Sequence, residues 1–222
     1  MLARLLYRDG LMLVVDKPAG LPVHRGPKGG DALEDYFDAL RFGLPRPPAL
    51  AHRLDRDTTG CLVLGRHRKA LALLGKLFKQ GKVGKCYWAI VEGGPQTDEG
   101  RIDIALAKRD DTRGWWMKAD PQGMPSTSTW KVMGRSSEFT WLALEPLTGR
   151  THQLRVHCAE MGWPVVGDTI YGTTSRVGGL HLHSRSVTIP ISKNKPPVKV
   201  IAPVPEAMRE KLLACGWEQK DV

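Results

Sequence analysis

The chain has 222 residues, enough for one sizeable hydrophobic core and too few for two comfortable domains. Its 41% hydrophobic content and 7 tryptophans exclude disorder as the main state. Lysine and arginine number 33 against 23 acidic residues, so the formal net charge is +10. A basic chain of this size favours a polyanionic partner, nucleic acid first.

The longest apolar runs, such as residues 11–15, are about five residues long, whereas a membrane-spanning helix needs roughly 20. Near the start, Arg4, Arg8 and Asp9 interrupt the apolar residues, so neither a continuous signal-peptide core nor a cleavage site is present. These features predict a cytoplasmic protein without a membrane partner.

The cysteines are scattered and form no CxxC pair or zinc spacing. They are Cys61, Cys86, Cys158 and Cys215. We expect reduced, buried thiols and no metal.

The first part of the chain alternates predicted strands and helices. Residues 11–15 and 61–64 are short apolar runs typical of buried strands. Asp31, with Glu34 as its capping partner, predicts a helix that ends by Gly43; its expected buried face is Leu33, Tyr36, Phe37 and Leu40. A second helix is expected at about 67–80, with Leu71, Leu74, Leu77 and Phe78 inward.

The rest of the chain is richer in strands. Residues 86–91, 102–106, 127–132, 140–144 and 180–189 are predicted strands. A helix is expected at 151–161, with Leu154, Cys158 and Met161 inward, and a last one between Pro205 and Gly216, with Met208, Leu212 and Leu213 inward. Because strands outnumber helices without regular interleaving, we predict an α+β fold in one domain over residues 1–222.

Two polar clusters could carry chemistry. Residues 51–60, AHRLDRDTTG, place charged groups and hydroxyls directly before a predicted buried strand. The alternative interpretation is a solvated turn in which Asp55 pairs with Arg53 or Arg56. Residues 147–157, LTGRTHQLRVH, put His152 and Arg155 three positions apart on one helix face. The alternative there is an exposed amphipathic helix with Arg155 as a surface charge.

Together the clusters resemble the RluA-type pseudouridine synthases. The first reads HRLDRDTTG against the family's HRLDxxTSG, with Thr59 in place of serine, and the second matches TGRxHQ(I/L)RVH throughout. Residues 16–21, 85–93 and 164–172 continue the resemblance in the family's order, so it covers nearly the whole chain.

The resemblance implies a mixed, largely antiparallel sheet in two lobes flanked by helices, with a basic active-site cleft between the lobes. It implies isomerisation of a specific uridine in RNA to pseudouridine, without cofactor or metal. It assigns Asp55 as the catalytic carboxylate, Arg155 as its ion-pair partner, Tyr87 as the ring against the target base, and Arg53 as the side chain that fills the vacated stack.

Elementary chemistry agrees with these roles. Burial alone would neutralise Asp55, whereas a neighbouring guanidinium favours its charged form. A uracil within structured RNA must flip out to reach a carboxylate, and a planar group can partly offset the unstacking.

Further RNA contacts are expected from basic or imidazole side chains, namely His52, Arg53, Arg150, His152, Lys79 and Lys82. For the lysines, a solvated face is an equally good interpretation. We expect a monomer that acts on tRNA or rRNA, and the sequence does not distinguish between these two substrates. Two rival functions are a catalytically silent RNA-binding or RNA-chaperone protein on the same fold, and a hydrolytic N-glycosidase.

Overall fold

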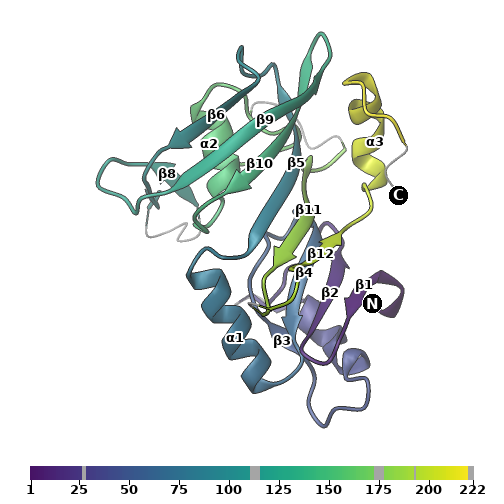
Figure 1. Cartoon of the computed structure of the whole chain (residues 1–222). Helices are drawn as coiled ribbons and strands as arrows, with labels where there is room; N and C mark the ends of the chain where they lie inside the picture. The colour runs from purple at the N-terminus through teal and green to yellow at the C-terminus, as the bar shows by residue number, and fades with distance from the viewer. Residues whose placement is uncertain (27–28, 111–115, 173–177, 193, 220–222) are drawn as a thin grey trace. The chain divides into compact units, whose positions relative to one another are not determined.

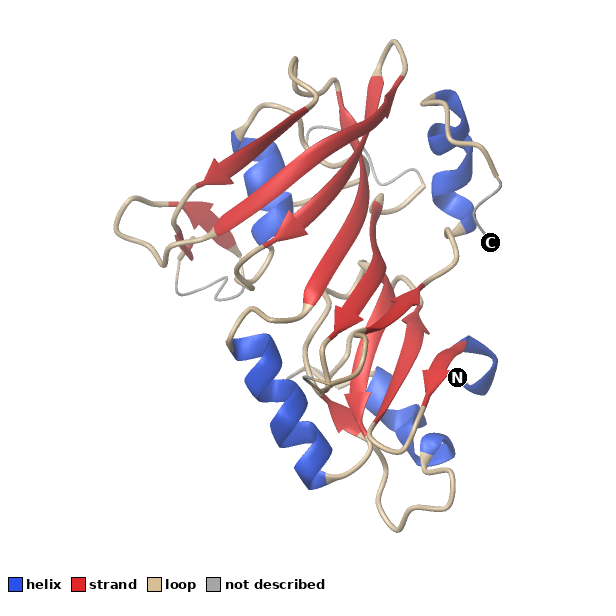
Figure 2. Ribbon diagram, in the orientation of Figure 1, coloured by secondary structure: helices blue, strands red, loops and turns tan. Residues whose placement is uncertain are grey.

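The computed structural model describes residues 1–26, 29–110, 116–172, 178–192 and 194–219 (Figure 1). The chain forms two compact units. The first comprises Met1–Lys85 and Ser184–Pro203, and the second comprises Cys86–His183 and Val204–Val222. Helices and strands are both present in each unit, and most of the described strand pairs are antiparallel (Figure 2). The predicted α+β fold is confirmed, whereas a single catalytic domain over residues 1–222 stays a prediction.

In the first unit, strands β1 (Leu5–Arg8), β2 (Met12–Lys17) and β4 (Thr59–Gly65) lie side by side in that order. The short β3 (Ala49–Leu50) also pairs with β4, and β12 (Val198–Ile201) pairs with β11 (Leu182–Ile189). Every residue of β4 is buried, which agrees with the apolar run that predicted this strand.

Helix α1 (Arg68–Lys79) covers this sheet with Ala70, Leu74 and Leu77. His67 caps it, because its Nδ1 accepts a hydrogen bond from the N–H of Ala70 at 3.2 Å. The core combines these side chains with strand residues, including Met12, Val14, Cys61, Val63, Val187 and Ile189. Fully burying a leucine or valine stabilises the fold by about 1.5–3 kcal/mol, so this core fixes β4 and the loop that precedes it.

The helix predicted near Asp31 is a 3-10 helix, η2, over Leu33–Leu40. Ala32 begins it, and the Asp35 carboxylate accepts the Ala32 N–H at 2.9 Å, so the expected Asp31–Glu34 capping pair was wrong. Tyr36 is 43% exposed and does not share the buried face. The other three predicted residues, Leu33, Phe37 and Leu40, are buried.

The second unit is built on four neighbouring strands in the order β5 (Gly84–Glu92), β10 (Phe139–Pro146), β9 (Thr127–Arg135) and β6 (Glu99–Asp103). Strands β7 (Leu106–Lys108) and β8 (Met117–Ala119) form a separate pair. The single strand predicted at 102–106 was wrong, because the chain leaves β6 after Asp103 and begins β7 at Leu106.

Helices α2 (Gln153–Glu160) and α3 (Glu206–Ala214) complete this unit. The core contains Trp88 and Trp141, whose rings meet edge to face with centroids 4.6 Å apart, and it contains Met208 and Leu212 from α3. Two predicted inward side chains are exposed instead, since Met161 follows the end of α2 with 44% exposure and Leu213 lies on the outer side of α3 with 52%.

Within the described part of the chain, no helix combines the length and apolar character needed to cross a membrane.

Candidate active site

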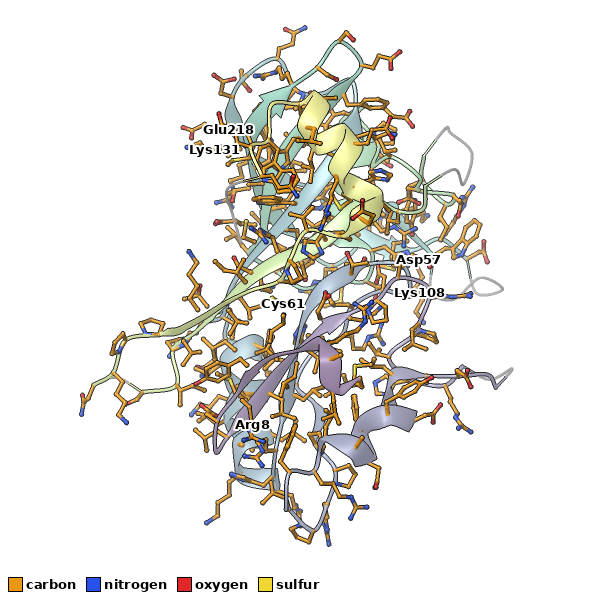
Figure 3. The ribbon with its side chains drawn as sticks, turned by 90° about the vertical axis from the view of Figure 1, so that its right-hand side faces the viewer. Arg8, Asp57, Cys61, Lys108, Lys131 and Glu218 are labelled. Atoms are coloured by element: carbon orange, nitrogen blue, oxygen red, sulfur yellow. The ribbon has the colours of Figure 1, made fainter. Side chains whose placement is uncertain are left out.

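The loop with Asp55 lies in the first unit, between β3 and β4. Arg53 and Asp57 are exposed, Asp55 is half-buried, and Thr58 and Thr59 are buried at the start of β4. Figure 3 labels Asp57 on this loop and Cys61 further along on β4. The N–H of Thr58 donates to the carbonyl of Asp55 at 3.2 Å. A tight turn therefore carries Asp55, with the buried strand as its support.

Lys17 anchors this loop from beneath. The side chain is fully buried, and its Nζ donates to the carbonyls of Pro18 and Arg56, each at 2.7 Å. Burial lowers the pKa of Lys17 to about 8, although the nearby Asp57 and Asp55 carboxylates oppose that shift. Sequence reasoning gave Lys17 no role; the available signal was a lysine at the end of an apolar strand, directly before a proline.

His52 is a second anchor of the loop. Its Nε2 accepts a hydrogen bond from the N–H of Val63 at 2.9 Å, and its ring stacks on Phe78 with centroids 4.5 Å apart. Burial, assisted by the charge of Lys85, lowers the pKa of His52 to about 3. The ring is therefore neutral at physiological pH and joins the loop to β4 and α1, while its predicted contact with RNA stays a prediction.

The second signature lies in the second unit, where the chain enters α2. The Gln153 side chain holds this entry, because its Oε1 accepts from Thr148 Oγ1 at 2.7 Å and from the Arg150 N–H at 3.0 Å. Its Nε2 donates to the Thr127 carbonyl at 2.9 Å. Thr148, Arg150 and Gln153 thus act together as one turn that connects β10 to α2.

Arg155 is buried, with 6% exposure, so the alternative of an exposed surface charge was wrong. Its Nε donates to Asp168 Oδ2 and its Nη2 to Asp168 Oδ1, both at 2.7 Å. Burial raises the pKa of the Asp168 carboxyl. The Arg155 guanidinium and the N–H groups of Ile170 and Tyr171 lower it by a larger amount together, so the net shift of the pKa is downward. Sequence reasoning placed Asp168 in a family segment but missed this ion pair.

Tyr171 brings His152 and Arg155 together. Its hydroxyl lies 2.8 Å from His152 Nδ1, and its ring centroid lies 5.2 Å from the guanidinium carbon of Arg155. His152 precedes α2 with a left-handed backbone at φ 53°. A non-glycine residue in this region is strained, and such strain often accompanies functional sites.

The other predicted site residues occupy varied positions. Tyr87 lies on β5 opposite Leu144 and is 8% exposed. Arg150 Nε donates to the Pro125 carbonyl at 3.2 Å. Lys79 ends α1, and both Lys79 and Lys82 are exposed. Asp55 belongs to the first unit and Arg155 to the second, so their pairing stays a prediction, as do the assigned roles.

Among the described residues, no group of three or more His, Cys, Asp or Glu side chains could hold a metal ion. His157, which ends the second signature, is used within the protein instead. Its Nε2 lies 2.8 Å from Ser126 Oγ, and its Nδ1 lies 3.1 Å from Ser128 Oγ.

Comparison with known proteins defines the class. The family model described as RNA pseudouridylate synthase matches residues 11–160. An uncharacterized RNA pseudouridine synthase of Zymomonas mobilis is 42% identical over 211 residues, covering 93% of this chain and 96% of the relative. The ribosomal large subunit pseudouridine synthase C of Buchnera aphidicola is 33% identical, covering 92% and 68%.

A solved structure agrees with these sequences. Human RNA pseudouridylate synthase domain containing 4 matches with a TM-score of 0.84 at 26% identity, covering 98% of this chain and 95% of that one. The fold and the two signatures define an RNA-modifying isomerase. The chain belongs to the RNA pseudouridylate synthase family, and the predicted resemblance and enzyme class are confirmed.

Proposed function

We propose that this protein converts a specific uridine in a structured RNA to pseudouridine, with Asp55 as the catalytic carboxylate. The observation that carries the proposal is the anchored loop, in which Lys17 and His52 hold the segment around Asp55 against β4. An anchored carboxylate is suited to covalent or proton-transfer chemistry, which requires a fixed geometry.

The reaction is an isomerisation and balances without a co-reactant. The bond from the ribose C1′ to the uracil N1 breaks, the base turns, and a bond from C1′ to C5 forms. C5 loses its proton, and N1 gains one. Asp55 either attacks the substrate or removes a sugar proton, and in each pathway it must be ionised beforehand.

Arg155 is the cation that we assign to Asp55. Its burial and ion pair with Asp168 support a fixed guanidinium rather than a mobile surface charge. Tyr87 would stack on the flipped base, and Arg53, which is exposed in the loop, would replace that base within the RNA stack.

Ribosomal RNA is the first substrate to test, because relatives from Buchnera aphidicola and Borreliella burgdorferi are named ribosomal large subunit pseudouridine synthases. Transfer RNA is the second candidate. The formal charge of +10 supports backbone contacts through Arg150, His152, Lys79 and Lys82. We further propose that the protein acts as a monomer in the cytoplasm.

One assay separates this proposal from its rivals. Transcripts of ribosomal and transfer RNA labelled with tritium at uridine C5 are incubated with the wild type and with Asp55→Asn. The wild type should release tritium and form pseudouridine, whereas Asp55→Asn should lose more than 100-fold in rate and bind RNA within a few-fold of wild type. That loss corresponds to at least about 2.7 kcal/mol of barrier.

Other products would point elsewhere. Free uracil with an abasic site would indicate an N-glycosidase, and RNA binding without either product would indicate a silent RNA-binding protein. Turnover by Asp55→Asn at a tenth of the wild-type rate or more would remove Asp55 from the mechanism.

A further inference from the structure

Asp168 lies at the centre of a buried side-chain network in the second unit. Its carboxylate is 1% exposed and binds the Arg155 guanidinium along one edge, with Nε on Oδ2 and Nη2 on Oδ1. Two parallel, charge-assisted hydrogen bonds of 2.7 Å fix both the position and the plane of a guanidinium.

The backbone turn that begins at Asp168 holds the Asp168 carboxylate in place. Asp168 Oδ1 also accepts the N–H of Ile170 at 2.9 Å and the N–H of Tyr171 at 3.2 Å, while the N–H of Gly172 donates to the Asp168 carbonyl at 2.9 Å. A Cβ on Gly172 would lie 2.5 Å from that carbonyl oxygen, so the turn requires glycine there. The orientation of the Asp168 carboxylate is therefore fixed by backbone hydrogen bonds that do not depend on Arg155.

Tyr171 extends the same turn to the start of α2. Its hydroxyl accepts the N–H of Met117 at 2.9 Å and also contacts His152 Nδ1, and its ring lies against the Arg155 guanidinium. A single turn thus contacts both Arg155 and the strained His152. Stability alone does not require this arrangement, because a buried ion pair is often no more stabilising than apolar side chains of similar volume.

We propose that Asp168 is a positioning residue for the isomerisation, acting through Arg155. By holding the Nε–Nη2 edge, it directs the remainder of the guanidinium and keeps it from adopting other rotamers. The inference rests on the proposed function, in which Arg155 keeps Asp55 ionised.

The amide variant separates charge from shape. Asp168→Asn keeps one oxygen acceptor but turns an N–H donor toward a guanidinium N–H, so one of the paired hydrogen bonds is lost. We expect single-turnover rates to fall at least 10-fold while RNA affinity stays within about threefold. The matched control is Asp103→Asn, which makes the same change at an exposed ion pair with Arg101 in the same unit and should stay within twofold of wild type.

A double-mutant cycle distinguishes positioning from loss of structure. If Asp168 acts through Arg155, adding Asp168→Asn to Arg155→Ala should lower the single-turnover rate no further. An independent structural effect would multiply the two losses. Active-site titration and circular dichroism on each variant would report the folded fraction, so that rates refer to folded protein.

The outcomes are distinct. Absence of pseudouridine with the wild type would overturn the proposed function and the inference with it. With an active wild type, an Asp168→Asn rate within twofold of wild type would overturn the inference alone. Multiplicative losses in the double variant would do the same, whereas a 10-fold loss that vanishes in the Arg155→Ala background would support it.

Discussion

The two signature regions are held in opposite ways. Around Asp55, buried side chains bind the backbone of a loop, since Lys17 donates to the Arg56 carbonyl and His52 accepts from Val63. Around Arg155, a backbone turn fixes the Asp168 carboxylate, and this carboxylate binds the Arg155 guanidinium. The first arrangement fixes where a loop runs, and the second fixes where a charge points.

This difference has an energetic consequence. The Arg155–Asp168 pair is buried on both sides, so removing one partner leaves the other charge without compensation. The Asp55 loop keeps exposed residues such as Arg53 and Asp57, so changes at those positions alter chemistry and RNA contacts more than stability. Stability and activity should therefore separate in the first region and fall together in the second.

The largest expected effect is at Arg155. Arg155→Ala should remove almost all activity and lower the free energy of unfolding by about 3–5 kcal/mol, because the Asp168 carboxylate would stay buried without its partner. Arg155→Lys keeps the charge but loses the planar guanidinium with its two parallel donors, so it should retain part of the activity and part of the stability. Urea unfolding and tritium release would be measured on the same preparations. Near-normal activity of Arg155→Ala would contradict the assignment.

A smaller effect is expected at Lys17, where we predict a modest loss of stability together with a loss of activity. Lys17→Met removes the donor to the Pro18 and Arg56 carbonyls but also removes the cost of burying an ammonium group. We expect unfolding to change by about 1–2 kcal/mol, in line with unsatisfied buried carbonyls, and the rate to fall roughly 10-fold, or about 1.4 kcal/mol of barrier.

The control for this variant is Lys69→Met on the exposed side of α1, which should leave unfolding within about 0.5 kcal/mol of wild type. If Lys17→Met unfolds much more easily and yet folded molecules react at the wild-type rate, Lys17 supports the unit without positioning the loop.

Acid should destabilise the first unit through His52. Its pKa falls to about 3 in the folded protein, against roughly 6.5 in an unfolded chain. Between these values the unfolded chain binds more protons, so stability decreases as the pH is lowered, by at most about 1.4 kcal/mol per pH unit. Unfolding measured from pH 7 to pH 4 should show a shallower slope in His52→Gln, which does not titrate. Identical slopes would exclude His52 as the titrating group.

Much of the fold was predictable from local patterns, and the reasons are physical. Apolar runs located β2 and β4 because strands buried on both faces leave few polar positions. Helix α3 was bracketed by Pro205 and by Gly216, whose φ of 88° suits a glycine stop. The boundary between β6 and β7 was missed because it lies inside one continuous β-rich segment.

The candidate site was predictable in its residue types but not in its partners. The signatures identified Asp55 and Arg155, yet Asp168 lies 13 residues beyond Arg155 in another segment, and no helical or strand period links them. Lys17 was missed because lysine is usually exposed, and its burial depends on the carbonyls of Pro18 and Arg56 that only the folded loop supplies.

The smallest expected effect concerns the lysines outside both anchored regions. Lys79 and Lys82 are exposed, so their contribution to RNA binding would be a phosphate contact that releases counterions rather than a buried bond. Log affinity should fall linearly with log salt, and changing both lysines to alanine should reduce the magnitude of that slope by about 1.4–1.8, at roughly 0.7–0.9 per phosphate contact. Filter binding at salt concentrations from about 50 to about 200 mM, a roughly fourfold range, would resolve such a change. The folded fraction should stay constant because neither lysine side chain is buried. An unchanged slope would assign these lysines to a solvated face, whereas a flat slope for the wild type would argue against phosphate-dominated binding of RNA altogether.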